Sequence, residues 1–117
     1  MNTDAAFEPI RAAAADLGLP GLEDGISYGT PALKVRGKLI ARLKDAETLV
    51  LRCPLDEKEM LMELEPEVFF ETDHYKGWPA VLVRLSCIEP AKLRQLLERA
   101  WRMQAPKRLI AAYDSGR

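Results

Sequence analysis

Hydrophobic and polar residues alternate most regularly between residues 33 and 44. The apolar positions lie on both sides of an Arg-Gly-Lys sequence and are Leu33, Val35, Leu39, Ala41 and Leu43. A period of two predicts strands with one buried face and one solvent-exposed face. Gly37 can adopt the positive φ of a tight turn, so the segment is predicted to form a β-hairpin.

Other segments complete the predicted sheet. Strands are predicted at residues 48–52, 68–70 and 80–85, and a loop or short strand at residues 25–31. The first of these strands continues the alternation of apolar and polar residues. The segment at 80–85 is almost wholly apolar, which is typical of a strand in the interior of a sheet.

Apolar residues at helical spacing predict helices at residues 4–17, 56–64 and 90–104, with a further short helix or turn at 107–113. Pro9 suits a first turn, so the N-terminal helix could begin near it. The helix at 56–64 is predicted to have Asp56 as its N-cap, with Met60, Leu61 and Leu64 inward and Glu57, Glu59 and Glu63 outward. The helix at 90–104 begins with Pro90, and its predicted inner face is Leu93, Leu96, Leu97, Ala100 and Trp101.

Strands joined by tight turns, with helices gathered outside them, indicate an α+β fold. The 117 residues are predicted to form a single domain, residues 1–117, in which helices pack outside an antiparallel sheet. No apolar segment approaches the length that spans a bilayer. The first ten residues lack the basic region of a signal peptide, so cytoplasmic residence is expected.

The net charge of −1 conceals a segregation of charge along the chain. Residues 34–52 hold six lysines and arginines against two acidic residues, whereas residues 53–73 hold eight acidic residues against Lys58. Residues 74–117 are basic again. A nucleic acid would therefore meet favourable charge only on the basic surfaces, at short range.

Residue types that carry common chemistries are sparse. One histidine and two cysteines are too few for a zinc site of the usual ligand count. Cys53 and Cys87 each lie near the end of an apolar segment and are predicted to be small buried thiols. No nucleophile elbow, Gly-rich phosphate loop or recognisable pair of catalytic carboxylates occurs. The sequence therefore predicts a protein that is not an enzyme and holds no metal or cofactor.

The first candidate site is a basic sheet face. Strand alternation predicts that most of its members lie on one side: Lys34, Arg36, Lys38, Arg42, Lys44 and Arg52, with Arg84 as a further candidate. Phosphates bind to cations that are spaced along a surface in this way. Two simpler interpretations stay open, because the face could be solvated or could pair with the acidic helix at residues 56–65.

The second candidate site is the loop at residues 71–79. It carries His74, Tyr75, Lys76 and Trp78, and Tyr28 from another loop could join them. Aromatic and basic groups on loops suit stacking on an exposed base or holding a small anion. A lone histidine is also commonly a hydrogen-bonded structural residue, and the aromatic side chains could instead close the edge of the core.

Two further clusters are candidates. Glu59 and Glu63, one helical turn apart, could hold a hard cation at the surface, although no loop supplies converging ligands and a solvated helix face is the simpler interpretation. Cations near the C-terminus suit the helix dipole and would extend a phosphate-binding surface if they adjoined the hairpin. These are Arg94, Arg99, Arg102, Lys107 and Arg108.

Several short motifs are distinctive in their order and spacing. They are Leu-Pro-Gly at 19–21, Ser-Tyr-Gly-Thr-Pro at 27–31, Lys-Val-Arg-Gly-Lys at 34–38, Glu-Val-Phe-Phe at 67–70, His-Tyr-Lys-Gly-Trp-Pro at 74–79, Val-Leu-Val at 81–83 and Ala-Pro-Lys-Arg-Leu at 105–109. Together they resemble the MmcQ/YjbR family across most of the chain. The resemblance implies a YjbR-like sandwich related in shape to frataxin, and DNA binding through a double-wing arrangement of hairpins. It supplies no catalytic residues.

The expected function is therefore non-enzymatic DNA binding through phosphates on the basic hairpin face. Low sequence specificity is expected, because no base-reading helix is recognisable. The alternative is a protein or small-ligand interaction module with Tyr28, His74, Tyr75 and Trp78 around a pocket. We expect no membrane partner, no identified protein partner, and a monomer or weak homodimer.

Overall fold

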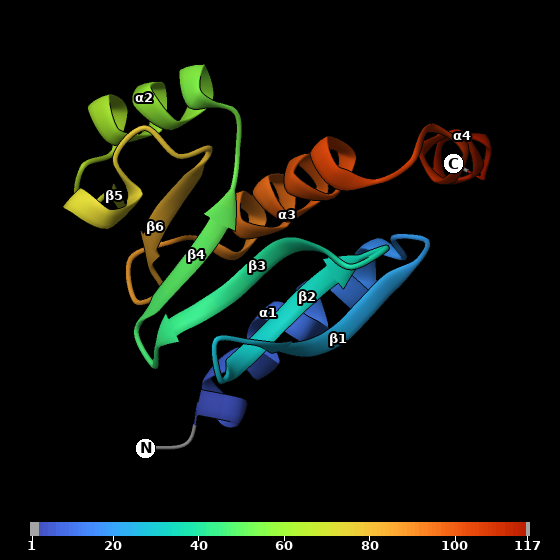
Figure 1. Ribbon diagram of the computed structural model, residues 1–117, viewed down its shortest axis with the longest axis horizontal. Coiled ribbons are helices and arrows are strands. Elements are labelled where there is room, and N and C mark those ends of the chain that lie inside the picture. The colour runs from blue at the N-terminus through green and yellow to red at the C-terminus, as the bar shows by residue number, and fades with distance from the viewer. Residues whose placement is uncertain (1–2, 117) are drawn as a thin grey trace.

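The computed structural model describes residues 3–116, which form one antiparallel sheet and the helices around it (Figure 1). The elements are α1 (Thr3–Leu17), β1 (Leu22–Ser27), β2 (Thr30–Val35), β3 (Lys38–Asp45), β4 (Thr48–Arg52), α2 (Leu55–Leu64), β5 (Phe69–Phe70), the 3-10 helix η1 (Asp73–Tyr75), β6 (Ala80–Arg84), α3 (Pro90–Gln104) and α4 (Lys107–Ser115). The predicted α+β class and antiparallel sheet are confirmed.

The six strands lie in the order β1-β2-β3-β4-β6-β5. Helices α1 and α3 contact each other and pack on the central strands, and Figure 1 shows both behind the sheet. The core lies between these helices and the sheet, where Phe7 and Trp101 are fully buried. The opposite sheet face is left uncovered over much of β2, β3 and β4, and α2 lies beside β5 and β6.

The predicted inner face of α3 is confirmed, because all five of its apolar positions are buried. The Trp101 indole N–H also donates a hydrogen bond to the carbonyl of Pro20 at 3.0 Å. The Trp101 ring meets the edge of Tyr113, with the centroids 5.1 Å apart. Trp101 thus joins α3 to the segment before β1 and to α4, the further short helix that the sequence predicts.

Helix α1 begins at Thr3, so Pro9 lies inside the helix rather than in its first turn. A proline six residues into a helix removes one intrahelical hydrogen bond. The helix is nevertheless held by the burial of Phe7 and Ile10, one on each side of the proline.

The predicted start of α2 is wrong, as are two of its three predicted inward positions, whereas Leu61 is buried and Glu59 and Glu63 are exposed as predicted. The helix begins at Leu55, and Pro54 is its N-cap, without a side-chain cap. Met60 and Leu64 are 53% and 69% exposed, whereas Lys58 and Leu61 are buried. The helix turns this face inward because the ammonium group of Lys58 finds oxygen acceptors there.

Of the two alternatives predicted for residues 25–31, the strand is confirmed, because the segment completes β1 and begins β2 on either side of a two-residue turn. The two strands are joined by Tyr28 and Gly29, with φ angles of 53° and 78°. Arg36 and Gly37 join β2 to β3 with φ angles of 51° and 77°. Positive φ at both central residues matches the right-handed twist of the strands, so two similar two-residue turns build this half of the sheet.

The two cysteines differ. Cys53 is buried as predicted, and burial, with a smaller contribution from Glu57, raises the pKa of its thiol to about 11. Cys87 is exposed, so its predicted burial is wrong. It lies beyond the end of β6 in the connection to α3, where no sheet neighbour covers it.

Within residues 3–116, no helix is long and apolar enough to cross a membrane.

The difference between the thiols gives a chemical prediction. At pH 8 a thiol-specific chromogenic reagent should label Cys87 quickly and Cys53 only after unfolding, because a buried thiol with a raised pKa is neither accessible nor ionised. The measurement is the number of fast-reacting thiols in the native protein, with Cys87→Ser as the control. Two fast thiols in the native protein would contradict the burial of Cys53.

Gly21 provides a stability prediction. Its φ is +72°, and an added Cβ would lie 2.8 Å from Leu109 Cδ1 on α4. Gly21→Ala should lower the free energy of unfolding by about 1–2 kcal/mol, mainly through backbone strain, since the Leu109 methyl can move aside. Gly25→Ala is the matched control, because its Cβ would meet no atom within 4 Å. Equal denaturation midpoints for the two variants would refute the prediction.

Candidate functional site

A groove of about 670 Å³ lies on the sheet face opposite α1 and α3. Its floor includes Leu39, Val50 and Ala80. Val50 alternates along β4 with Leu49 and Leu51, which belong to the core beneath the helices. The β1–β2 turn and the loop around η1 contribute further lining residues, so the groove has walls as well as a floor.

The groove brings together members of both predicted candidate sites. Three cations line it: Lys34, Arg42 and Arg52. Four ring-bearing side chains also line it: Tyr28, His74, Tyr75 and Trp78. None of the described residues that line the groove is acidic. The two candidate sites lie on different segments of the sequence, and the structure places members of both around one groove.

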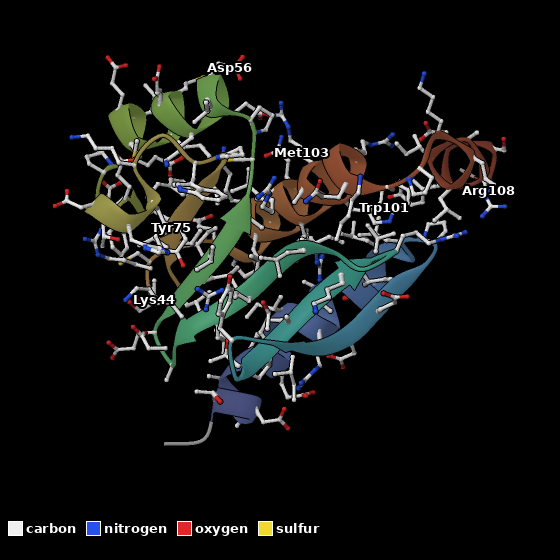
Figure 2. The ribbon with its side chains drawn as sticks, viewed as in Figure 1. Lys44, Asp56, Tyr75, Trp101, Met103 and Arg108 are labelled. Atoms are coloured by element: carbon white, nitrogen blue, oxygen red, sulfur yellow. The ribbon has the colours of Figure 1, made fainter. Side chains whose placement is uncertain are left out.

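The remaining predicted cations of the hairpin lie outside the groove. Arg36 lies in the β2–β3 turn, and Lys38 pairs with buried Val35, which directs it to the other side of the sheet. Lys44 is exposed at the far end of β3, beside the β3–β4 turn (Figure 2). The prediction of a common face is therefore only half right.

Two irregularities in β3 explain this departure from alternation. The pairing with β2 shifts by one residue, so that Ala41 faces Leu33 but Leu39 faces Lys34. This bulge inserts Ile40, which is buried, and places Leu39 on the groove face instead of in the core. A second shift at Leu43 disturbs the register before Lys44.

Arg42 is the best-held cation of the groove. Its Nη2 donates to the Tyr75 hydroxyl at 2.5 Å, and its Nη1 donates to the carbonyl of Leu43 at 3.2 Å. Its Cζ lies 4.9 Å from the centroid of the Tyr28 ring, in cation–π geometry. Arg42 therefore joins the two aromatic walls, and these hydrogen bonds use two of its five N–H donors.

Lys34 and Arg52 have more capacity for a ligand. Neither forms an ion pair with a described residue, and Arg52 Nε is buried with no hydrogen-bond partner. Glu23 faces Lys34 from β1, but its carboxylate accepts a hydrogen bond from the Gly37 N–H at 3.3 Å. An anion in the groove would meet three cations that form no ion pair with a described residue, and Lys34 and Arg52 are the two that are not held by the aromatic walls.

The aromatic side chains differ in exposure. Tyr75 is partly buried and packs against the small cluster of Val50, Ala80 and Leu82. Tyr28 and Trp78 are 89% and 57% exposed, although they are large rings. The His74 ring meets the edge of Tyr75, with the centroids 4.9 Å apart. Tyr75 is thus a structural wall, and Tyr28 and Trp78 present free ring surface.

Lys58 holds the loop that carries these rings, and sequence reasoning missed it. Its Nζ donates to the carbonyl oxygens of Tyr75 and Trp78, at 2.7 and 3.0 Å, and lies 2.8 Å from the Glu71 carboxylate. The side chain is 2% exposed. The sequence did contain a signal for the burial of Lys58. It is the single cation in residues 53–73, which hold eight acidic residues, and it lies one helical turn before the apolar Leu61.

The C-terminal cations do not extend the groove. Arg94 pairs with Asp16, Arg99 pairs with Glu57, and Arg102 pairs with Glu98 and Asp114. Hydrogen bonds to Asp114 first and Glu98 next raise the pKa of Arg102. Lys107 and Arg108 are exposed on α4, and Figure 2 shows Arg108 far from Lys44 and Tyr75.

Neither of the other two candidates supports a site of its own. Arg84 stacks over Phe70, with Cζ 4.1 Å from the ring centroid, and donates to the carbonyls of Pro66 and Glu67. Glu59 and Glu63 are exposed on α2. Among residues 3–116, no group of three His, Cys, Asp or Glu side chains is placed to hold a metal ion.

Comparisons with known proteins give a family and no activity. The sequence model of the YjbR family matches residues 17–103, which include every strand and most of α3. Uncharacterized proteins of Mycobacterium bovis and Mycobacterium tuberculosis are 52% identical over 56 residues. That segment is 48% of this chain and 43% of each relative.

The Lys58 contacts lead to a stability prediction. Lys58→Met should lower the free energy of unfolding by about 2–4 kcal/mol, because Glu71 and two carbonyls lose their buried partner. The measurement is chemical denaturation, and acrylamide should quench Trp78 more readily in this variant. Lys92→Met is the matched control, since it removes a half-exposed cation 3.9 Å from Glu65 and should change stability by less than about 0.5 kcal/mol. Similar effects of the two substitutions would rule out the role assigned to Lys58.

Proposed function

Because the chain belongs to the YjbR family, we propose that it binds nucleic acid, DNA in the first instance, without catalysing a reaction. The observation that supports this proposal most strongly is the composition of the groove. Its described lining combines cations, exposed aromatic rings and an apolar floor, and it contains no carboxylate. Phosphates bind to such cations, and nucleobases stack on such rings.

Phosphate contacts are assigned first to Lys34 and Arg52, which line the groove and form no ion pair with a described residue. Lys38 is directed to the other side of the sheet and is assigned no phosphate contact. Arg36 in the β2–β3 turn and Lys44 near the end of β3 would extend the cationic track beyond the groove. Such contacts read no base sequence, so binding is of low specificity.

The distribution of charge supports binding on this face in particular. The acidic residues of α2 are exposed or paired elsewhere, and Glu57 contacts Arg99 of α3. A polyanion would be repelled from α2 and attracted to the groove at distances within the Debye length. The net charge of −1 means that attraction is local and that binding weakens steeply with salt.

A small aromatic anion is a second candidate ligand for the same groove. The volume of about 670 Å³ lies within the range of about 300–1,000 Å³ that small-molecule sites occupy. An acid on an aromatic ring could lie between Arg52 and Trp78. Such a ligand would raise the melting temperature of the protein, whereas Trp78→Ala would remove the shift. Its binding would also depend less on salt than that of a polyanion.

Substitution of the groove cations tests the proposal. Arg52→Gln and Lys34→Gln should each weaken DNA binding by a similar factor on unrelated sequences and lower the slope of log affinity against log salt by about one. The measurement is fluorescence anisotropy of labelled DNA over a range of salt concentrations.

Two substitutions on the other side of the molecule provide matched controls. Arg94→Gln and Lys92→Gln remove the same charges from α3, where Arg94 pairs with Asp16 and Lys92 with Glu65. They should leave affinity within about two-fold of the parent protein. The proposal fails if no DNA binds at low salt, or if the α3 substitutions weaken binding as much as the groove substitutions.

A further inference from the structure

The turns of the hairpins do not form a basic surface that could hold a DNA duplex. The β1–β2 turn carries Tyr28 and Gly29, which are uncharged, and the β3–β4 turn at the same end of the sheet carries Asp45 and Glu47 (Figure 1). The basic tip with Arg36 lies at the opposite end of β2. Lys44 lies beside these two neighbouring tips, but it adjoins two carboxylates, so the tips are poorly suited to the phosphates that flank a duplex groove.

The cations and rings instead meet inside a hollow. Lys34 and Arg52 come from strands β2 and β4 of the sheet face that forms its floor, whereas Tyr28 and Trp78 come from a turn and a loop at its sides. A duplex is read by convex elements that enter its grooves, such as a helix in a major groove about 12 Å wide. A concave surface with recessed cations cannot enter a duplex groove, but it can receive an unpaired nucleotide.

The ring of Tyr28 and the backbone of Trp78 are each held by a contact that leaves ring surface free. Arg42 lies against the Tyr28 ring at 4.9 Å, and Lys58 holds the carbonyl of Trp78 at 3.0 Å. Tyr28 is 89% exposed and Trp78 is 57% exposed. Exposed rings on anchored backbone are the stacking platforms that single-strand binding uses, because every base has a face to stack.

We infer that the groove binds single-stranded DNA in preference to duplex, with a base stacked on Trp78 and the adjoining phosphates at Lys34 and Arg52. This inference rests on the proposed nucleic-acid binding and specifies its substrate. Tyr28 offers a second stacking surface across the groove. Stacking is tolerant of sequence, so the preference is for the unpaired state and not for a base order.

The test compares two probes on the full chain. One is a labelled oligothymidylate of roughly twelve nucleotides, within the usual size of single-strand sites. The other is a labelled blunt-ended duplex of the same length, which has no unpaired loop. Electrostatics alone would favour the duplex, because it carries charge at a higher density. We expect the single strand to bind at least about ten-fold more tightly at the same salt concentration.

Substitutions at Trp78 separate stacking from charge. Trp78→Ala should weaken binding of the oligothymidylate about ten-fold and leave duplex binding nearly unchanged, whereas Trp78→Phe should retain most of the affinity. Lys58 contacts the backbone carbonyl of Trp78, so its hydrogen bond remains in both variants. Leu64→Ala is the control, because it removes an exposed apolar side chain on α2, outside the groove.

The outcomes distinguish this inference from the proposed function. Equal or tighter binding of the duplex would overturn the inference and leave the proposed function in place, as would an oligothymidylate affinity that Trp78→Ala does not change. Failure of both probes to bind at low salt would overturn both. A preference for the single strand that Trp78→Ala abolishes and Trp78→Phe preserves would support both.

Discussion

The buried ammonium group of Lys58 is the constraint on which the groove depends. A charge that is 2% exposed is tolerated only where hydrogen-bond acceptors replace water, and all three of its acceptors belong to residues 71–78. Two of them are backbone carbonyls, so the contact fixes the path of the loop and not only one side chain. The loop, much of which is exposed, is thereby held in one place against α2.

From this loop a chain of contacts crosses the open sheet face. The Tyr75 hydroxyl accepts a hydrogen bond from Arg42 on β3, and the Arg42 guanidinium stacks on Tyr28 in the β1–β2 turn. Segments far apart in the sequence are thus joined into one rigid rim. A site that is already ordered loses less conformational entropy when a ligand binds. The same contacts hold Arg42 in place without neutralising its charge, and Lys34 and Arg52 are the groove cations that are not tied to the rim.

The local pattern of apolar and polar residues was sufficient to predict the helices and strands, but it was insufficient to predict how the site is assembled. The spacing of Leu93, Leu97 and Trp101 fixes the buried face of α3, because a helix is periodic over its whole length. Alternation failed in β3, where Leu39, Ile40 and Ala41 are three apolar residues in succession, and only the pairing with β2 decides which of them the bulge inserts. The inward turn of Lys58 was missed for a similar reason. Its acceptors lie 13 to 20 residues further along the chain, so only the tertiary fold brings them together.

The two tryptophans allow the central claim to be tested in one spectrum. Trp78 lies in the groove, whereas the Trp101 indole N–H is bound to the Pro20 carbonyl in the core. A nitrogen-15-labelled sample should be titrated with a short oligothymidylate while the two indole N–H signals are followed. The account predicts that the Trp78 signal moves progressively and the Trp101 signal stays in place. Binding that leaves the Trp78 signal unmoved would contradict the assignment of the groove as the contact surface.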